Sequence, residues 1–170
     1  MDKKYKLTEE TINVNSRTLY RIEALKDFGN VRKGEKGGFI EKESNLSQNG
    51  DCWVYDNAKV YDDAIVLNDA SICDNAVVCG EAMVCNSAKV CTNAIVNDIA
   101  VVYGNAEIFG DAWVYGNAKV YGNAKVRDHA KVRDEAKVRD DVVVCDNAWV
   151  CDNAQVFGSA VVSGNAVVSD

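Results

Sequence analysis

A chain of 170 residues, 48% of them hydrophobic, is long enough to form one hydrophobic core and too apolar to stay disordered. Its formal net charge of -7 argues against general nucleic-acid binding, and no apolar run reaches the roughly 18 residues that cross a bilayer. We therefore expect a soluble, cytoplasmic protein that is not membrane-bound.

The first part of the chain does not repeat. Alternating apolar and polar residues in Arg17–Leu25 predict a strand, and Lys6–Leu7 and Thr11–Val14 predict two shorter ones. The polar pair Asn15–Ser16 is typical of a turn. We therefore expect short strands joined by this turn near the start of the chain.

A six-residue grid that becomes strict later in the chain already reaches Ile40 and Leu46. These two residues fall on the positions of the later alanines, so we expect the coil to begin there in degenerate form. A solenoid leaves an open sheet edge and an open core at its end, and an atypical segment usually covers them. We therefore divide the chain into a capping segment, residues 1–45, and a repeat body, residues 46–170.

From Ala58 onward the sequence repeats every six residues. Alanine occupies 18 of 19 positions from Ala58 to Ala166, and the position two residues later is valine or isoleucine throughout. Because side chains alternate across a strand, the Ala-x-Val pair is predicted to face inward. The pairs before each alanine, such as Gly116–Asn117, consist of residues that favour tight turns. Each hexad therefore predicts one short side of a coil and one corner.

The hexad VYGNAK, residues 114–119, resembles the hexapeptide repeat of left-handed parallel β-helices. The segments that precede the strict grid resemble those of YdcK-like proteins, a group that often carries an acyltransferase label; they are residues 25–29, 37–41, 45–47 and 53–58. The resemblance implies an all-β fold, a left-handed parallel β-helix with triangular coils of three hexads and an N-terminal β cap. The handedness rests on the resemblance alone.

Coils of three hexads place residues 18 apart on top of one another. One side of the prism then presents an apolar outward row, Val77, Ile95, Trp113, Trp149 and Val167, broken by Lys59 and Lys131. Apolar rows of this length indicate a subunit interface, and the resemblance implies a homo-oligomer, typically a trimer. The alternative is that strand propensity alone placed valine and isoleucine at these outward sites.

One coil carries a belt of outward basic residues, Lys125, Arg127, Lys131, Arg133, Lys137 and Arg139. The spacing of 18 places Lys131 between Trp113 and Trp149, and Arg133 beside Tyr115. Cations interleaved with aromatic rings are suited to a phosphate-bearing ring compound, so these five residues are the candidate ligand-binding site. The alternative is that the arginines pair with Asp128, Asp134 and Asp140 while the aromatic rings cover their stems.

The seven cysteines follow the repeat rather than an independent framework. Cysteines six residues apart lie on different sides of the coil, which argues against a metal cluster, because metal ligands must converge. We therefore expect reduced thiols at an outer repeat position and no bound metal.

The resemblance also implies an acyltransferase, with a histidine base near a subunit interface and a loop that helps to hold the acyl donor. His129 is the one histidine and is a weak candidate base, at a corner stacked between Asp111 and Asn147. No insertion interrupts the grid from Ala58 to Ala166, so no loop builds a pocket. A single histidine also excludes the zinc site of γ-type carbonic anhydrases, and we predict no cofactor.

These observations favour a non-enzymatic, oligomeric β-solenoid that acts as a binding or scaffolding module. One alternative is an acyltransferase-like hexapeptide-repeat enzyme that uses His129. A second alternative is a module that sequesters a nucleotide or another phosphorylated small ligand on the surface around Lys131 and Trp149.

Overall fold

Every hexad from Asp56 to Gly164 turns at the same backbone position. In the computed structural model, which describes residues 3–170, the first corner residue of each of these hexads has a positive φ. This residue is Gly, Asp or Asn in every hexad except one, where Thr92 has a φ of 63°. Glycine, asparagine and aspartate enter this conformation most readily. The predicted corners are therefore confirmed.

Two-residue strands lie between the corners and form three parallel sheets along the body. The first is part of a ten-stranded sheet, whose outer surface we call face A; its body strands are β5 (Lys59–Val60), β8 (Val77–Val78), β11 (Ile95–Val96), β14 (Trp113–Val114), β17 (Lys131–Val132), β20 (Trp149–Val150) and β23 (Val167–Val168). The seven-stranded sheet carries face B; its strands are β4 (Trp53–Val54), β7 (Ser71–Ile72), β10 (Lys89–Val90), β13 (Glu107–Ile108), β16 (Lys125–Val126), β19 (Val143–Val144) and β22 (Val161–Val162). The six-stranded sheet carries face C; its strands are β6 (Ile65–Val66), β9 (Met83–Val84), β12 (Val101–Val102), β15 (Lys119–Val120), β18 (Lys137–Val138) and β21 (Gln155–Val156).

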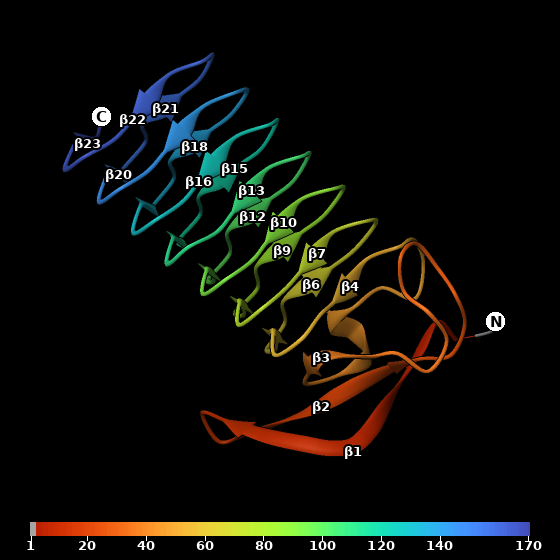
Figure 1. The fold of residues 1–170 in the computed structure, drawn as a ribbon. Coiled ribbons are helices and arrows are strands. Elements are labelled where there is room, and N and C mark those ends of the chain that lie inside the picture. The colour runs from red at the N-terminus through yellow and green to blue at the C-terminus, as the bar shows by residue number, and fades with distance from the viewer. Residues whose placement is uncertain (1–2) are drawn as a thin grey trace.

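Residues 18 apart are partners in all three sheets, as in Trp113 with Lys131 and Lys131 with Trp149. The coils follow one another along a single axis, with the first hairpin at one end and β23 at the other (Figure 1). The chain is an all-β, left-handed parallel β-helix, as predicted.

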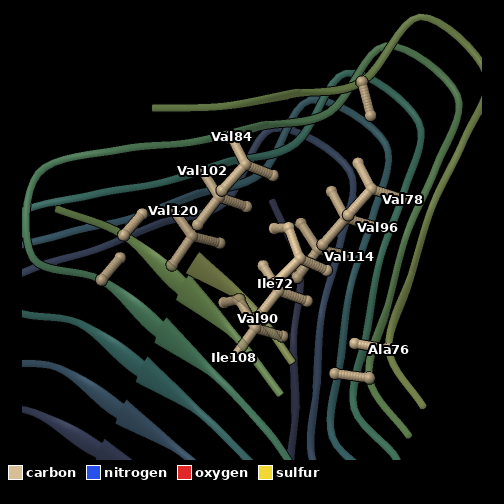
Figure 2. Close-up of a cluster of buried hydrophobic side chains, with 14 of the residues drawn as sticks. Ile72, Ala76, Val78, Val84, Val90, Val96, Val102, Ile108, Val114 and Val120 are labelled. Carbon is tan, nitrogen blue, oxygen red and sulfur yellow. The ribbon is translucent and has the colours of Figure 1, made fainter. Parts of the chain in front are cut away.

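The core consists of the inward alanines and the inward valines or isoleucines. Ala112 and Val114 are fully buried, and the same holds for their equivalents in neighbouring coils. Three columns of aliphatic side chains, one from each sheet, meet inside the prism (Figure 2); they are Val78, Val96 and Val114, then Val84, Val102 and Val120, then Ile72, Val90 and Ile108. The predicted inward Ala-x-Val pair is therefore confirmed.

An antiparallel hairpin precedes the coils. Its strands β1 (Tyr5–Val14) and β2 (Arg17–Ala24) meet at Asn15 and Ser16, both with positive φ, so the predicted turn and the strand after it are confirmed. The two shorter strands predicted before the turn are parts of one strand, β1, whose pairing register shifts between Leu7 and Thr11. A third strand, β3 (Lys36–Ile40), pairs with β2 on one side and with β5 of the body on the other. The hairpin therefore extends the ten-stranded sheet beyond the first coil.

The first coil is two residues longer than the others, which corrects one prediction. Ile40 pairs with Val60, and Leu46 bridges to Val66, a separation of 20 residues. The separation falls to 18 from Val54 onward, which pairs with Ile72. Ile40 and Leu46 therefore occupy valine positions and not the predicted alanine positions, because the grid cannot reveal two extra residues between Leu46 and Val54.

A 3-10 turn, η1 (Glu43–Asn45), closes the first corner of this long coil. Asn45 is fully buried, and its amide nitrogen donates hydrogen bonds to the carbonyl oxygens of Asp62 (3.0 Å) and Ala64 (2.8 Å). This is the one helical element of residues 3–170, and no helix in that range could cross a membrane. Residues 1–2 of the predicted capping segment lie outside the described residues.

Candidate binding surface on face A

The candidate site lies on three neighbouring strands of face A. The ammonium group of Lys131, on β17, is 5.4 Å from the ring centroid of Trp113 on β14 and 4.9 Å from that of Trp149 on β20. No carboxylate in residues 3–170 forms an ion pair with Lys131. The two indole rings therefore provide the close electrostatic partners of this charge, an arrangement worth about 0.5–2 kcal/mol.

The remaining predicted residues join this surface at the adjacent corner. The guanidinium of Arg133 lies 5.4 Å from the Trp149 ring centroid, and the rings of Trp113 and Tyr115 meet edge to face at 6.2 Å. Burial raises the pKa of Tyr115, while the charge of Arg133 opposes this shift. The five residues predicted as a ligand site therefore form one continuous aromatic–cationic patch, which comprises Trp113, Tyr115, Lys131, Arg133 and Trp149.

The arginines of the basic coil are paired with acids. Each arginine forms an ion pair with the aspartate that directly follows it in the sequence. The Nη1–Oδ2 distance is 2.7 Å for Arg127, 2.7 Å for Arg133 and 2.9 Å for Arg139. Those aspartates, Asp128, Asp134 and Asp140, also accept hydrogen bonds from backbone N–H groups one coil further on. The alternative interpretation, in which each arginine neutralises a corner aspartate, is therefore confirmed at the level of contacts.

His129 stands in an exposed row of corner side chains. Its Nδ1 is 3.5 Å from Oδ2 of Asp111, and the imidazole is 66% exposed. Asp111 also accepts a hydrogen bond from Asn93, and asparagine replaces His129 one coil later at Asn147. The structure thus brings an acid to His129 but leaves the imidazole in solvent.

Two open hollows that the sequence did not reveal surround Ile99, at the edge between faces A and C. The first has a volume of about 480 Å³ and includes Lys119, Glu135 and Lys137 in its lining. The second reaches Asp134, the acid that pairs with Arg133 of the patch. Ile99 is 48% exposed at a corner where other coils carry Asp, Glu or Asn. This apolar residue at a polar corner is the sequence feature from which the hollows could have been predicted.

The cysteine prediction is wrong for one pair. Cys73 and Cys91 form a disulfide, with their Cα atoms 4.6 Å apart. They lie 18 residues apart and therefore stack directly on one another. The divergence predicted from the sequence holds only for cysteines six residues apart, which lie on different sides of the coil. The other five cysteines, Cys52, Cys79, Cys85, Cys145 and Cys151, are free thiols, and three of them, Cys52, Cys145 and Cys151, are buried. Cys145 and Cys151 still occupy the predicted outer repeat position, where their sulfurs lie beside corner aspartates.

Possible metal ligands converge in three places, each again built from residues 18 apart. One group is Cys73, Asp74 and Cys91, whose sulfurs are joined in the disulfide. The other two each combine one cysteine with two corner aspartates, and Arg127 or Arg133 pairs with one of those aspartates. The expected divergence therefore applies to hexad neighbours and not to stacked residues.

The apolar row of face A is shorter than the sequence indicated. Val77 packs against the cluster of Leu19, Phe39 and Tyr61, which the hairpin residues Ile12 and Val14 also contact. Further along the face, Trp113 is 43% exposed and Val167 is 62% exposed. The hairpin therefore covers the first part of face A and leaves the patch open.

Comparison with known proteins gives a limited similarity. No family model matches the chain. The chain is 47% identical over 38 residues to the uncharacterized acetyltransferase YdcK of Escherichia coli (strain K12). The match covers 22% of this chain and 12% of that protein. Together with the stacked six-residue coils, this similarity fits a hexapeptide-repeat superfamily.

Proposed function

We propose that this protein is a non-enzymatic, self-associating β-solenoid that serves as a rigid binding or scaffolding module. The observation that carries the proposal is the aromatic–cationic patch on a face of uninterrupted coils. Stacked strands hold its side chains at a fixed spacing of about 4.8 Å, so a partner meets a preorganised surface. Tryptophan and arginine dominate the binding energy of many protein interfaces.

The partner that we infer for this surface is a second copy of the chain. Trp113 is 43% exposed, and Ile95 and Val167 continue its row. Exposed apolar side chains in a row favour burial against another protein surface. Lys131 interrupts the row, but its charge already lies between two indole rings, so its ammonium group is partly desolvated before any contact forms.

Sedimentation equilibrium tests this proposal. We expect the wild type to sediment as a multiple of one chain mass at micromolar concentration, and the double variant Trp113→Ala, Trp149→Ala to dissociate. Phe157→Ala is the matched control, because Phe157 is a 57% exposed aromatic residue outside face A. A wild-type protein that stays monomeric at high micromolar concentration contradicts self-association.

A second candidate is an acyltransferase-like enzyme. Two observations favour it: the name of the matched E. coli protein, and the contact between His129 and Asp111, which can orient an imidazole as a general base. If this candidate is correct, the protein consumes acetyl-CoA with an amine acceptor, and His129→Asn abolishes the reaction. Asparagine occupies the same corner at Asn147, so this variant preserves the fold. No consumption by the wild type rejects the candidate.

A third candidate is the sequestration of a nucleotide or another phosphorylated small ligand on the patch. The exposed indole rings and the charge of Lys131 between them favour it, while the pairing of Arg133 with Asp134 opposes it. Calorimetry with a panel of nucleotides tests whether the patch binds such a ligand. Binding by the wild type that is lost in Trp149→Ala supports the candidate, and no binding by the wild type rejects it.

A further inference from the structure

We propose that the Cys73–Cys91 pair is a thiol-exchange site that reacts with small anionic thiols. The disulfide joins residues 18 apart and therefore closes one complete coil into a covalent ring. Both cysteines are half-buried, at the corner that follows face B. Five other cysteines in residues 3–170 are free thiols, and none of them lies 18 residues from another cysteine, so Cys73 and Cys91 are the one stacked pair of that range.

An open hollow gives access to one of the two sulfurs. Cys91 lines a hollow of about 300 Å³ together with Lys89, Glu107, Ile108 and Phe109. Cys73 is not part of this lining. We therefore assign Cys91, the cysteine beside the hollow, as the one that an external thiol attacks.

The charges around the hollow favour an anionic reagent. The carboxylate of Glu107 lies 3.4 Å from the ammonium group of Lys125, which neutralises it. Lys89 is exposed and has no ion-pair partner within residues 3–170. Lys89 is therefore available to attract carboxylates, and Phe109 offers an apolar wall, so the site is suited to a small thiol that carries carboxylates.

The exchange is a balanced reaction in two steps. In the first step, an external thiolate attacks Sγ of Cys91, the disulfide bond breaks, and Cys73 leaves as a thiolate. The product is a mixed disulfide on Cys91, and the released Cys73 thiolate takes a proton from water. In the second step, another external thiolate attacks the mixed disulfide, which releases the small-molecule disulfide and the Cys91 thiolate. Two electrons pass from the small thiols to the protein, and the reverse reaction with a small disulfide closes the ring.

Opening the ring removes one covalent link from a coil and none of its backbone hydrogen bonds. Backbone bonds still join Cys73 to Val90 at 2.9 Å and Cys91 to Ile108 at 2.9 Å. The covalent link restricts the unfolded chain, so its loss lowers stability mainly through the unfolded state. The pair therefore makes the stability of the coils nearest the hairpin depend on the thiol-to-disulfide ratio.

Alkylation followed by peptide mass mapping tests the pairing. After equilibration with glutathione disulfide we expect the Cys73–Cys91 linkage, five alkylated thiols and a melting temperature that falls when reduced glutathione is added. In Cys73→Ser, glutathione should remain attached to Cys91, whereas Cys145→Ser should keep the wild-type linkage. Seven alkylated thiols in the oxidised wild type overturn the proposal.

Exchange rates test the preference for anionic thiols. We expect Lys89→Gln to slow reduction by glutathione about 3- to 10-fold and to leave reduction by uncharged 2-mercaptoethanol unchanged. Lys137→Gln, on face C, is the matched control and should change neither rate. Equal effects of Lys89→Gln on both thiols overturn the assigned ligand class. These outcomes do not depend on the oligomeric state that the proposed function requires.

Discussion

The regular spacing of 18 begins at Val54, so the structure is best divided there, into a capped end, residues 3–54, and a body of regular coils, residues 55–168. These two regions have cores of different kinds. The body core consists almost entirely of small alanines and β-branched aliphatic side chains, each with many equivalents. The capped end buries Tyr5, Trp53 and even Lys4, whose ammonium group donates to the carbonyl oxygens of Gly50 (3.1 Å) and Cys52 (2.9 Å). The capped end therefore depends on single contacts, while the body distributes its stability over many similar ones.

The largest effect that we predict is at the junction between the two regions. Trp53 is fully buried, and its ring meets Phe28 edge to face at 5.3 Å and Tyr5 at 6.1 Å. Trp53→Ala should lower the free energy of unfolding by about 3–5 kcal/mol, because it leaves a large cavity. Urea denaturation measures the change. Phe157→Ala, at an exposed site of the body outside face A, should cost less than about 1 kcal/mol. Similar losses in both variants contradict the distinction between the regions.

A smaller effect should separate a buried amide from a surface one. Asn45→Ala leaves the carbonyl oxygens of Asp62 and Ala64 without their side-chain donor, which should cost about 1–3 kcal/mol. Asn105 likewise donates a side-chain hydrogen bond, to Oδ1 of Asn123 at 3.1 Å, but it is exposed. Asn105→Ala should therefore cost about 0.5 kcal/mol or less in the same denaturation experiment. If both variants lose the same free energy of unfolding, burial does not determine the contribution of a side-chain amide.

One substitution in the body should increase stability. Thr92 has a φ of 63° in a conformation that β-branched residues rarely adopt, and its N–H still donates to Asp74 at 2.9 Å. Thr92→Asn should relieve the strain and keep that bond, raising the free energy of unfolding by about 1 kcal/mol. The control is Thr11→Asn, in strand β1, which should give no gain. A loss of stability in Thr92→Asn contradicts the strain argument.

The effect that we expect to be smallest concerns acid pH and belongs to the capped end. Glu10 accepts hydrogen bonds from Arg21 (2.6 Å) and Lys36 (3.0 Å), and the Arg21 bond is the main cause of its lowered pKa. A carboxylate with a lowered pKa stabilises the folded state above its unfolded value of 4.5, and this contribution is lost as pH falls through the folded pKa. The contribution of Glu10 to the stability of the hairpin should therefore weaken below pH 4.5.

Amide exchange in the hairpin measures this effect against a variant. At neutral pH, Glu10→Gln should exchange faster than wild type in β1 and β2, and the difference should shrink as the wild-type carboxylate is protonated. Glu9→Gln, at the exposed neighbouring position, should exchange like wild type at every pH. A difference between Glu10→Gln and wild type that persists at low pH rules out the carboxylate as its cause.

The structure of the body was predictable, because a six-residue repeat is compatible with few backbone arrangements. Alternation assigned Ala112 and Val114 to the interior, and turn residues assigned the corners, since both follow from local geometry. The capped end was less predictable, because its contacts join residues far apart in sequence. Strand β3 and the longer first coil depend on such contacts, as does the position of the hairpin over Val77.

The candidate site was predictable in position but not in chemistry. The spacing of 18 placed Lys131 between two tryptophans, and the contacts agree. Whether Arg133 prefers a ring or a carboxylate depends on side-chain rotamers, which the period does not determine, and the guanidinium contacts both. The stacking of Cys73 on Cys91 did follow from the same spacing, but it required a comparison between coils rather than between hexads.

The six-residue corner spacing also determines how such a protein can change by duplication or loss of segments. Gaining or losing one hexad preserves the Ala-x-Val interior but moves every later residue to the next side of the prism, a rotation of the surface by one third of a turn. A gain or loss of 18 residues changes only the length of the rod. The aromatic–cationic patch requires Trp113, Lys131 and Trp149 to stay in register, so it survives either kind of change outside residues 113–149. A change of one hexad before the patch, however, moves it to another side of the prism relative to the hairpin. Surface and core can therefore evolve separately, with the size of the inserted segment deciding which faces are rearranged.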